Sequence, residues 1–347
     1  MKNFEKLKFF LLKPVSKKQI ILIFLFLIFF SFLFLSLKTQ KTFVVSNKET
    51  EKLFKEKKET KNPSPFSGIY CKDNKKRAIG VIFAQYPQTI PLSGISEADL
   101  VVEWPVAERG GVTRLLGIFQ CNQPKEVGSI RSIRPYIVDI AFGFDSVLVS
   151  WGGASSAIKR VENLKIDWLD GRVNPSGAFF RKSSKMAPHN GFASFSGIWQ
   201  AMEKLNIRKE NNFEGYKFLK LTEFKNKLVD QVININYYYP VKYIYDKKTG
   251  NYLRYWNGRE FLDFLTKKQV FAKNVVLLKT EITTISPGVA DAKIIGQGQA
   301  KIYQMGEIIE AIWKKDSPSG KLYFLDKEGK EIKFVPGPIW IEIVDEF

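Results

Sequence analysis

The sequence is poor in the residues that build metal centres. It contains one histidine, His189, and two cysteines, Cys71 and Cys121, with no CxxC pair. Structural zinc sites need four Cys or His ligands, and these three separated residues do not supply them. We therefore expect neither a metal nor another cofactor. The two cysteines fit either a disulfide in an extracytoplasmic protein or a pair of buried free thiols.

Acidic residues are scarce relative to basic ones. The chain has 35 Asp and Glu against 54 Lys and Arg, which gives a formal net charge of +19. Fourteen Lys and only five Glu lie within residues 1–65, around an apolar segment. This placement favours anionic lipid or an anionic cell-wall polymer as the partner. The sequence has no zinc-finger spacing and no basic recognition helix, so nucleic acid is not an expected partner.

Long apolar runs are limited to one. Residues 19–37 carry no charge, and a helix of that length, at about 1.5 Å per residue, spans a bilayer core. The positive-inside rule places the Lys-rich residues 1–18 in the cytoplasm. Because no A-x-A cleavage site and no lipid-accepting Cys follow the run, we favour an uncleaved single-pass anchor in the plasma membrane over a cleaved signal peptide. Residues 38–65 are then a charged tether for extracytoplasmic domains.

Residues 66–205 predict a domain with a mixed α/β sheet. Apolar runs of strand length alternate with segments of helical periodicity, which is typical of layered folds. Ser129 is the expected N-cap of a helix that reaches Phe142, with Pro135 in its first turn, and Ser194 is the expected cap of another. The remaining predicted elements are strands at 78–84, 99–104, 114–121 and 146–151, and helices at 154–163 and 194–205.

The rest of the chain has a different pattern. Residues 206–230 are rich in Lys and Asn and are expected to form a linker, whereas short strand-like runs separated by polar Gly turns predict a small antiparallel β domain at 231–347. The predicted fold class is therefore α+β, with an N-terminal transmembrane helix ahead of both domains. The expected strands here are 232–239, 243–246, 252–256, 274–280, 298–304, 308–314, 322–325, 331–335 and 340–344.

The segment GSIRSIRP places Arg131, Ser132 and Arg134 at the start of an expected helix. Backbone N–H groups at a helix N-terminus favour anions, and Arg side chains bind carboxylate or phosphate with two parallel hydrogen bonds. The segment therefore indicates an anion site. The alternative is that each Arg pairs with an internal carboxylate, such as Glu103 or Asp139.

Two glycine pairs flank this segment. The run GGVTR could turn between strands and point Arg114 at the same site, although a plain hairpin turn fits equally well. The run WGGAS follows a strand and opens a helix, where ligands of open α/β sheets bind. Gly152 and Gly153 would allow close approach of the backbone, and Ser155 could donate a hydrogen bond. A Gly–Gly turn is also common wherever the backbone needs a positive φ.

The sequence APHN holds His189 beside Asn190. A histidine can act as a general base or a hydrogen-bond donor near neutral pH, although a single histidine is more often structural. Catalysis would also need a nucleophile and an orienting acid. The candidates are Ser132, Ser155, Asp139 and Asp145.

The last domain is rich in aromatic residues. They could stack on sugar rings, or they could fill the core of a small β domain, which is the more common role. The residues concerned are Tyr237, Tyr238, Tyr239, Tyr255, Trp256, Trp313 and Trp340.

Motifs along the chain resemble those of the YerB-like bacterial lipoproteins. They include ISEADLVVEWPV, GGVTRLLGIFQ, VGSIRSIRPYIVDIA, WGGAS, APHN, YWNG, NVVLL, GQGQAKIYQMGE and DKEGKEIKFVPGPIWIEIV, in the same order and from about Ala78 to the C-terminus. The resemblance implies a membrane-attached extracytoplasmic protein with paired N- and C-terminal domains of unknown function. It implies no particular activity.

Two features differ from the family pattern. The resemblance implies a lipid-accepting Cys near the N-terminus, where this chain has the apolar run 19–37 instead. It also implies a His just before the second Gly pair, where this chain has Trp151. A partner for His189 is therefore missing, which argues against metal binding or catalysis based on histidine.

Three functions fit these observations. The leading hypothesis is a non-enzymatic envelope module that binds an anionic wall component, such as peptidoglycan, or an envelope protein. Its polar contacts would come from Arg114, Arg131, Arg134, His189 and Asn190. The alternative is a wall hydrolase or transferase with His189 as general base. The third is a structural domain that docks onto a partner.

Overall fold

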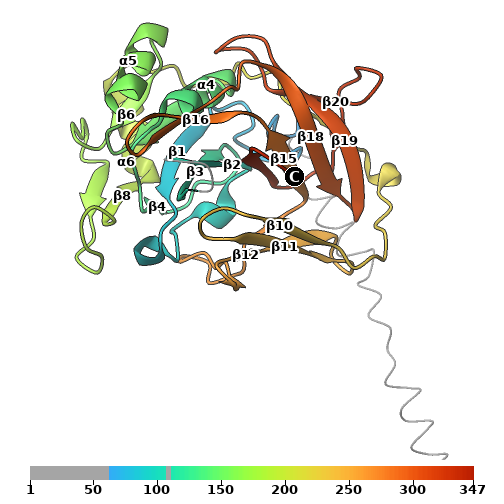
Figure 1. Cartoon of the computed structure of the whole chain (residues 1–347). Helices are drawn as coiled ribbons and strands as arrows, with labels where there is room; N and C mark the ends of the chain where they lie inside the picture. The colour runs from blue at the N-terminus through green and yellow to red at the C-terminus, as the bar shows by residue number, and fades with distance from the viewer. Residues whose placement is uncertain (1–61, 107–110) are drawn as a thin grey trace, which may run out of the picture. The chain divides into compact units, whose positions relative to one another are not determined.

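The computed structural model describes residues 62–106 and 111–347. They belong to one compact unit, Thr60–Phe347 (Figure 1). The expected anchor at 19–37 lies outside the described residues, as do the basic tail and most of the tether. Within the described ranges, no helix is both long enough and apolar enough to cross a membrane.

A ten-stranded sheet runs through this unit. Its strand order is β20-β19-β18-β15-β22-β2-β3-β1-β5-β6. The N-terminal half of the chain supplies five neighbouring strands and the C-terminal half supplies the other five. Their bounds are β1 Ile79–Ala84, β2 Leu100–Pro105, β3 Thr113–Phe119, β5 Val147–Ser150, β6 Trp168–Asp170, β15 Asn274–Lys279, β18 Gly296–Gln304, β19 Glu307–Lys315, β20 Tyr323–Leu325 and β22 Ile339–Val344.

Strand β22 joins the two halves of this sheet. It lies between β15 and β2 and is parallel to both, with Ile339 opposite Asn274 on one side and Leu100 on the other. Every residue of its sequence IWIEIV is buried, as expected for a strand covered on both faces. The expectation of a small antiparallel β domain at 231–347 holds for most of its strand pairs, but β22 pairs in parallel and its sheet continues into the preceding domain.

Four smaller sheets surround the large one. A five-stranded sheet and a three-stranded sheet are the larger two, and the other two are pairs of strands. The five-stranded sheet contains β10 Val232–Ile235, β11 Val241–Asp246, β12 Asn251–Trp256, β13 Arg259–Glu260 and β14 Phe271–Ala272. The others contain β4 Glu126–Gly128, β7 Phe179–Arg181 and β8 Gly191–Ser194; β16 Ile282–Ser286 and β17 Val289–Ala292; and β9 Lys217–Phe218 and β21 Lys333–Phe334.

Three α-helices are found in the described residues: α4 Pro135–Gly143, α5 Ser155–Leu164 and α6 Phe195–Lys204. Ser194 caps α6 as predicted, since its side chain accepts a hydrogen bond from the backbone N–H of Gly197 at 3.1 Å. Pro135 begins α4, also as predicted. The prediction that Ser129 caps α4 is wrong. Arg134 holds the N-cap position, and the Ser129 hydroxyl donates instead to the backbone carbonyl of His189.

Two hydrophobic clusters cover opposite faces of the ten-stranded sheet. One packs α4 and α5 against the sheet, and the other packs the β10–β12 sheet against it (Figure 1). Phe213 and Tyr216, from the segment expected to be a linker, are buried in the first cluster. Buried aromatic residues of the C-terminal half therefore serve the core. They are Tyr237, Trp256, Trp313 and Trp340.

Three 3₁₀ helices complete the described secondary structure: η2 Pro87–Thr89, η3 Ile95–Glu97 and η4 Leu221–Glu223. The first follows β1 directly and carries the chain away from the end of that strand. Tyr86, the residue before η2, is thereby placed at the edge of the candidate site described below.

Cys71 and Cys121 form a disulfide, with their Cα atoms 5.5 Å apart and a sequence separation of 50. The sequence left open whether the two cysteines form a disulfide or stay as free thiols, and the structure has the disulfide. The bond ties the segment before β1 to the end of β3. It fits a protein that folds in an oxidising compartment.

Candidate anion-binding site

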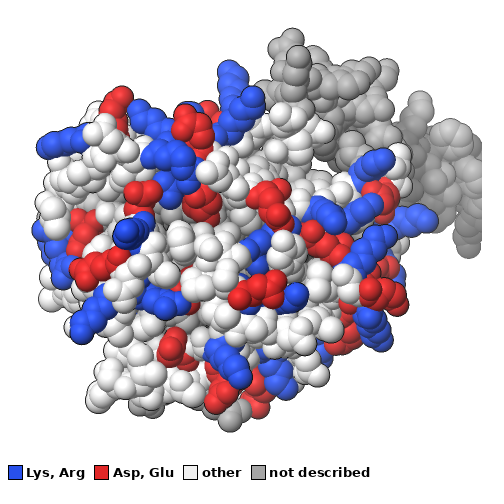
Figure 2. Space-filling model, turned by 90° about the horizontal axis from the view of Figure 1, so that it is seen from above, with Lys and Arg blue, Asp and Glu red and all other residues white. Residues whose placement is uncertain are grey.

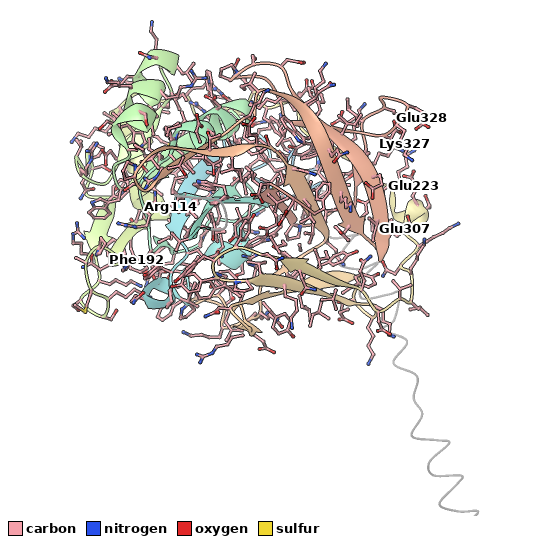
Figure 3. The ribbon with its side chains drawn as sticks, in the orientation of Figure 1. Arg114, Phe192, Glu223, Glu307, Lys327 and Glu328 are labelled. Atoms are coloured by element: carbon pink, nitrogen blue, oxygen red, sulfur yellow. A yellow bond between two sulfur atoms is a disulfide. The ribbon has the colours of Figure 1, made fainter. Side chains whose placement is uncertain are left out.

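One pocket brings together Arg114, Arg131 and His189, which are far apart in sequence. Its volume is about 280 Å³, and it opens beside the ends of β1, β2 and β3. Figure 3 shows Arg114 beside these strands. The residues that line the pocket are Ala84, Gln85, Tyr86, Val106, Val112, Thr113, Arg114, Arg131 and His189.

Arg114 lies near the start of β3, in the middle of the large sheet. Its side chain is buried, and Nη1 donates to the backbone carbonyl of Ser132. Burial lowers the pKa of Arg114 well below its usual value, and the positive charges of Arg134 and Arg131 lower it further. No carboxylate in the described part of the chain forms an ion pair with this guanidinium group. The pocket therefore contains a buried cation that lacks a counter-charge among the described residues.

Arg131 supplies the second guanidinium group. Its backbone N–H donates to the carbonyl of Ile82 at 2.9 Å, which fixes the segment against β1. Its half-buried side chain forms no hydrogen bond or ion pair with any described residue, and burial lowers its pKa. The carboxylates proposed as internal partners are engaged elsewhere. Glu103 pairs with Arg254, and Asp139 pairs with Arg160 at 2.8 Å.

Arg134 lies behind the pocket and does not line it. Its guanidinium group donates to the backbone carbonyls of Val106, Ile133 and Gly288, at 3.2–3.4 Å. Carbonyl oxygens satisfy its N–H groups without neutralising its charge. Burial and the charge of Arg131 both lower its pKa. Its positive charge adds to the potential that an anion in the pocket would experience.

His189 forms one wall of the pocket. Its ring stacks on Tyr86, with centroids 5.4 Å apart and planes 7° apart. Burial lowers the pKa of His189 below its usual value, and the charges of Arg131 and Lys185 lower it further. The imidazole is therefore neutral at neutral pH. Its Nδ1 atom is buried and has no hydrogen-bond partner among the described residues.

The floor of the pocket consists of Gln85 and Thr113, which the sequence analysis missed. Both side chains donate to Oε1 of Glu103, Gln85 at 2.6 Å. Ala84 pairs with Arg114 across β1 and β3, so Gln85 and Thr113 lie opposite each other just beyond that pair. Gln85 and Thr113 could have been identified as polar residues at the end of one apolar strand and the start of another.

The remaining predicted site residues lie outside the pocket lining. The hydroxyl of Ser132 donates to the carbonyl of Trp151 at 3.0 Å, and Oδ1 of Asn190 accepts from Arg181 at 2.6 Å. Ser155 is the exposed first residue of α5. Their polar groups are directed at neighbouring residues or at solvent, so they position the surrounding loops.

The Gly152–Gly153 pair packs against the arginine segment. The N–H of Gly152 donates to Oδ1 of Asp170 at 2.9 Å, and its carbonyl accepts from the N–H of Ile133. A Cβ atom at Gly153 would lie 2.4 Å from Cγ1 of Ile133. The glycines therefore allow a close approach of two backbone segments that fixes the residues between Arg131 and Arg134.

Beneath the floor lies a buried charge cluster. The guanidinium group of Arg254 donates to Glu103 and to Glu342, the latter at 3.0 Å, and all three side chains are fully buried. The Tyr243 hydroxyl donates to Glu342 at 2.6 Å. Burial raises the pKa of Glu103 to about 8, Arg254 opposes this shift, and the like charge of Glu342 adds to it.

This raised pKa makes stability depend on pH. In the unfolded chain Glu103 loses its proton near its ordinary value of 4.5, whereas in the folded chain it keeps the proton up to about pH 8. Its contribution to stability is therefore complete below pH 4.5 and is lost as pH rises to about 8. Between pH 4.5 and about 8, we expect the free energy of unfolding of the parent to fall by up to about 1.4 kcal/mol per pH unit relative to that of Glu103→Gln. Urea unfolding at pH 5, 6, 7 and 8 measures this slope.

The control for this prediction is Glu203→Gln. The Glu203 side chain is 73% exposed, so the same change of charge there should leave the slope of the parent unaltered. Equal slopes for the parent and Glu103→Gln would show that Glu103 ionises normally in the folded protein.

The face of the molecule in Figure 2 carries charges of both signs. Figure 2 shows Lys and Arg interspersed with Asp and Glu over the face in view, without a broad field of one sign. A mixed surface attracts polyanions weakly and loses that attraction with salt. The residues that the structure describes contain no group of three or more His, Cys, Asp or Glu that could hold a metal ion.

Comparisons with known proteins agree with this architecture. Residues 66–208 match the "Protein of unknown function (DUF3048) N-terminal domain" and residues 232–341 match the "Protein of unknown function (DUF3048) C-terminal domain". The "Putative lipoprotein YerB" of Bacillus subtilis (strain 168) is 33% identical over 291 residues, which cover 82% of this chain and 86% of that protein. The crystal structure of YerB protein from Bacillus subtilis matches with a TM-score of 0.73 and 30% identity, over 82% of this chain and 97% of that one. This chain therefore belongs to the YerB-like family with paired DUF3048 domains.

Proposed function

We propose that the protein is a membrane-attached, extracytoplasmic module that binds an anionic component of the cell envelope in the Arg114–Arg131 pocket. The Bacillus subtilis relative, "Putative lipoprotein YerB", supports the location by its name, as does the Cys71–Cys121 disulfide. Residues 19–37 are the proposed anchor. The observation that carries the binding proposal is the pair of guanidinium groups without a carboxylate partner among the described residues.

The physical reason is the cost of burying a cation. An arginine keeps its proton in proteins, so burial cannot be relieved by neutralising the side chain. A buried charge without a counter-charge is strongly unfavourable, and an anion between Arg114 and Arg131 would remove that cost. Guanidinium groups also bind carboxylate and phosphate with directed pairs of hydrogen bonds. The ligand is therefore expected to be anionic and to enter as a small group.

The arrangement of His189 favours binding over hydrolysis. The Ser129 hydroxyl donates to the backbone carbonyl of His189, and the Ser132 hydroxyl donates to the carbonyl of Trp151. Among the described residues, no hydroxyl or thiol forms a hydrogen bond with the imidazole ring. A general base needs such a contact with the group that it activates. His189→Gln would abolish a hydrolase but only weaken a binding protein.

The binding experiment compares the fragment Thr60–Phe347, which is one compact unit, with its Arg131→Gln variant. We expect the parent to sediment with isolated peptidoglycan sacculi at physiological salt. Loss of one charged hydrogen-bonding group should weaken binding roughly 10- to 100-fold, so the variant should stay in solution. Arg259→Gln is the matched control. It makes the same change of charge at an exposed position of β13 and should sediment as the parent does.

Two results would contradict this proposal. If the parent and both variants sediment only at low salt, the attraction is diffuse and the pocket is not the site. If the parent does not sediment at all, the wall is not the ligand. Glu108 lies in sequence between Val106 and Val112 but outside the described residues. Binding that appears only in Glu108→Gln would identify that carboxylate as the natural counter-charge.

A further inference from the structure

The pocket contains two polar atoms without partners in addition to its arginines. Oε1 of Gln85 and Nδ1 of His189 are buried, and neither forms a hydrogen bond with any described residue. Buried polar atoms in folded proteins nearly always have a partner. Gln85 is 1% exposed, so solvent does not readily serve this role. Both residues line the pocket, so a ligand bound there is the nearest candidate partner for the two atoms.

A hydrogen bond to Glu103 fixes the orientation of the Gln85 amide. Its Nε2 atom donates to Glu103 at 2.6 Å, and its Oε1 atom takes no part in this bond. The Nδ1 atom of His189 belongs to a ring held in place by its stack on Tyr86. The positions of these two hydrogen-bonding atoms are therefore fixed before a ligand binds. We expect the ligand to carry a polar, uncharged group that bonds with them, next to the anionic group that the arginines attract.

The size and remaining lining of the pocket limit the ligand further. A volume of about 280 Å³ is slightly below the usual range for small-molecule sites, which begins at about 300 Å³. A small molecule or the end of a polymer fits this volume. Ala84, Val106 and Val112 supply apolar contacts, which suit a short aliphatic side chain.

We propose that the pocket binds the carboxylate end of an acylated small amino acid, such as the C-terminus of a peptide. This inference rests on the proposed function and names its ligand. The carboxylate would lie between the guanidinium groups of Arg114 and Arg131. The amide one carbon away would form hydrogen bonds with Gln85 and His189, and the short side chain would contact the apolar lining.

A phosphate polymer fits these groups less well. The oxygens of a phosphodiester only accept hydrogen bonds, so they would satisfy the arginines and leave Oε1 of Gln85 without a partner. A peptide end offers a carboxylate to accept and an amide N–H to donate. The same chemistry is present in the stem peptides of peptidoglycan and in free peptides. Intact sacculi and soluble peptides distinguish these two sources.

The test is calorimetric titration of the fragment Thr60–Phe347 with N-acetyl-alanyl-alanine as the L,L and the D,D isomer. We expect one isomer at least to bind, with affinity lost when the carboxylate is converted to an amide. The analogue with lactate in place of the last alanine keeps the carboxylate and replaces N–H by an ester oxygen. Its binding should be roughly 10-fold weaker, as expected for one lost hydrogen bond beside an unpaired acceptor.

Two variants separate recognition from folding. His189→Phe keeps a ring to stack on Tyr86 but removes the nitrogen atoms, and Gln85→Met removes the amide at similar length. Thermal unfolding first establishes that each is folded. We expect the 10-fold preference for amide over ester to disappear in at least one of them, because the acceptor is gone. A merely structural role would change both affinities equally and preserve the ratio.

The outcomes also separate this inference from the proposed function. If inorganic phosphate or glycerol phosphate binds in an Arg131-dependent way and neither peptide does, the anion pocket stands and the peptide inference is wrong. If amide and ester bind equally to the parent, the proposed role of Gln85 and His189 is wrong. If no anion binds, both proposals fail.

Discussion

Replacing Arg254 with methionine is expected to lower the free energy of unfolding by about 3–5 kcal/mol. Arg254 is fully buried and is the cation between Glu103 and Glu342. Its guanidinium group also lies 4.3 Å from the ring centroid of Trp340. Removing it leaves the two buried carboxyl groups without their shared hydrogen-bond donor. Chemical denaturation of the parent and the variant at pH 7 measures the loss.

A milder change in the same cluster provides the control. Tyr243→Phe removes one hydroxyl that donates to Glu342 and should cost about 1 kcal/mol. If Arg254→Met is no more destabilising than Tyr243→Phe, the ion cluster contributes little net stability. That result would be consistent with buried ion pairs whose attraction only offsets their desolvation.

Removing the disulfide is the second large change. Cys71→Ser with Cys121→Ser opens a loop of 50 residues, and chain entropy alone predicts a loss of about 4 kcal/mol at 25 °C. We expect a measured loss of about 2–4 kcal/mol, because unfolded chains retain some structure. Urea unfolding with and without dithiothreitol measures it. The reductant should destabilise the parent by a similar amount.

The double serine variant is its own control for the reductant. Dithiothreitol should leave its unfolding curve unchanged, since no disulfide remains to be reduced. If the parent unfolds identically under reducing and oxidising conditions, the bond either does not form or adds nothing to stability. Mass spectrometry of the alkylated, unreduced parent decides between these two results.

Local signals in the sequence predicted most elements of the first domain. The run AIGVIFA contains β1, the runs DLVVEW and RLLGIFQC cover all but one residue of β2 and of β3, and Ser194 caps α6 as its spacing indicated. These features depend on residues that are close in sequence. Short-range periodicity and capping chemistry determine them, so they can be recognised without knowing the fold.

Long-range pairing was not predictable in the same way. Nothing in IWIEIV states that β22 inserts between β15 and β2, because any strand with apolar residues on both faces can occupy a central position. The prediction of the residue that caps α4 was wrong for a related reason. Ser129 has a hydroxyl suitable for capping, but the fold places the carbonyl of His189 within its reach.

The candidate site was predictable in part. Arg114, Arg131 and His189 were identified from residue type and from the turns that carry them, and the structure places all three in one pocket. The sequence could not decide whether Glu103 and Asp139 neutralise the arginines, because that depends on Arg254 and Arg160 as competing partners. The floor of the pocket was missed because the role of Gln85 depends on its buried hydrogen bond with Glu103, which the sequence does not reveal.

The position of β22 also has a consequence for the order of events during biosynthesis. Residues 339–344 follow all other strands of the large sheet in the chain, yet they fill its middle. Until β22 is in place, β2 and β15 each present an unpaired edge, and such edges pair readily with other chains. The chain is therefore expected to depend on chaperones until residues 339–344 are available to pair. Once they are, the ten strands can close into one sheet.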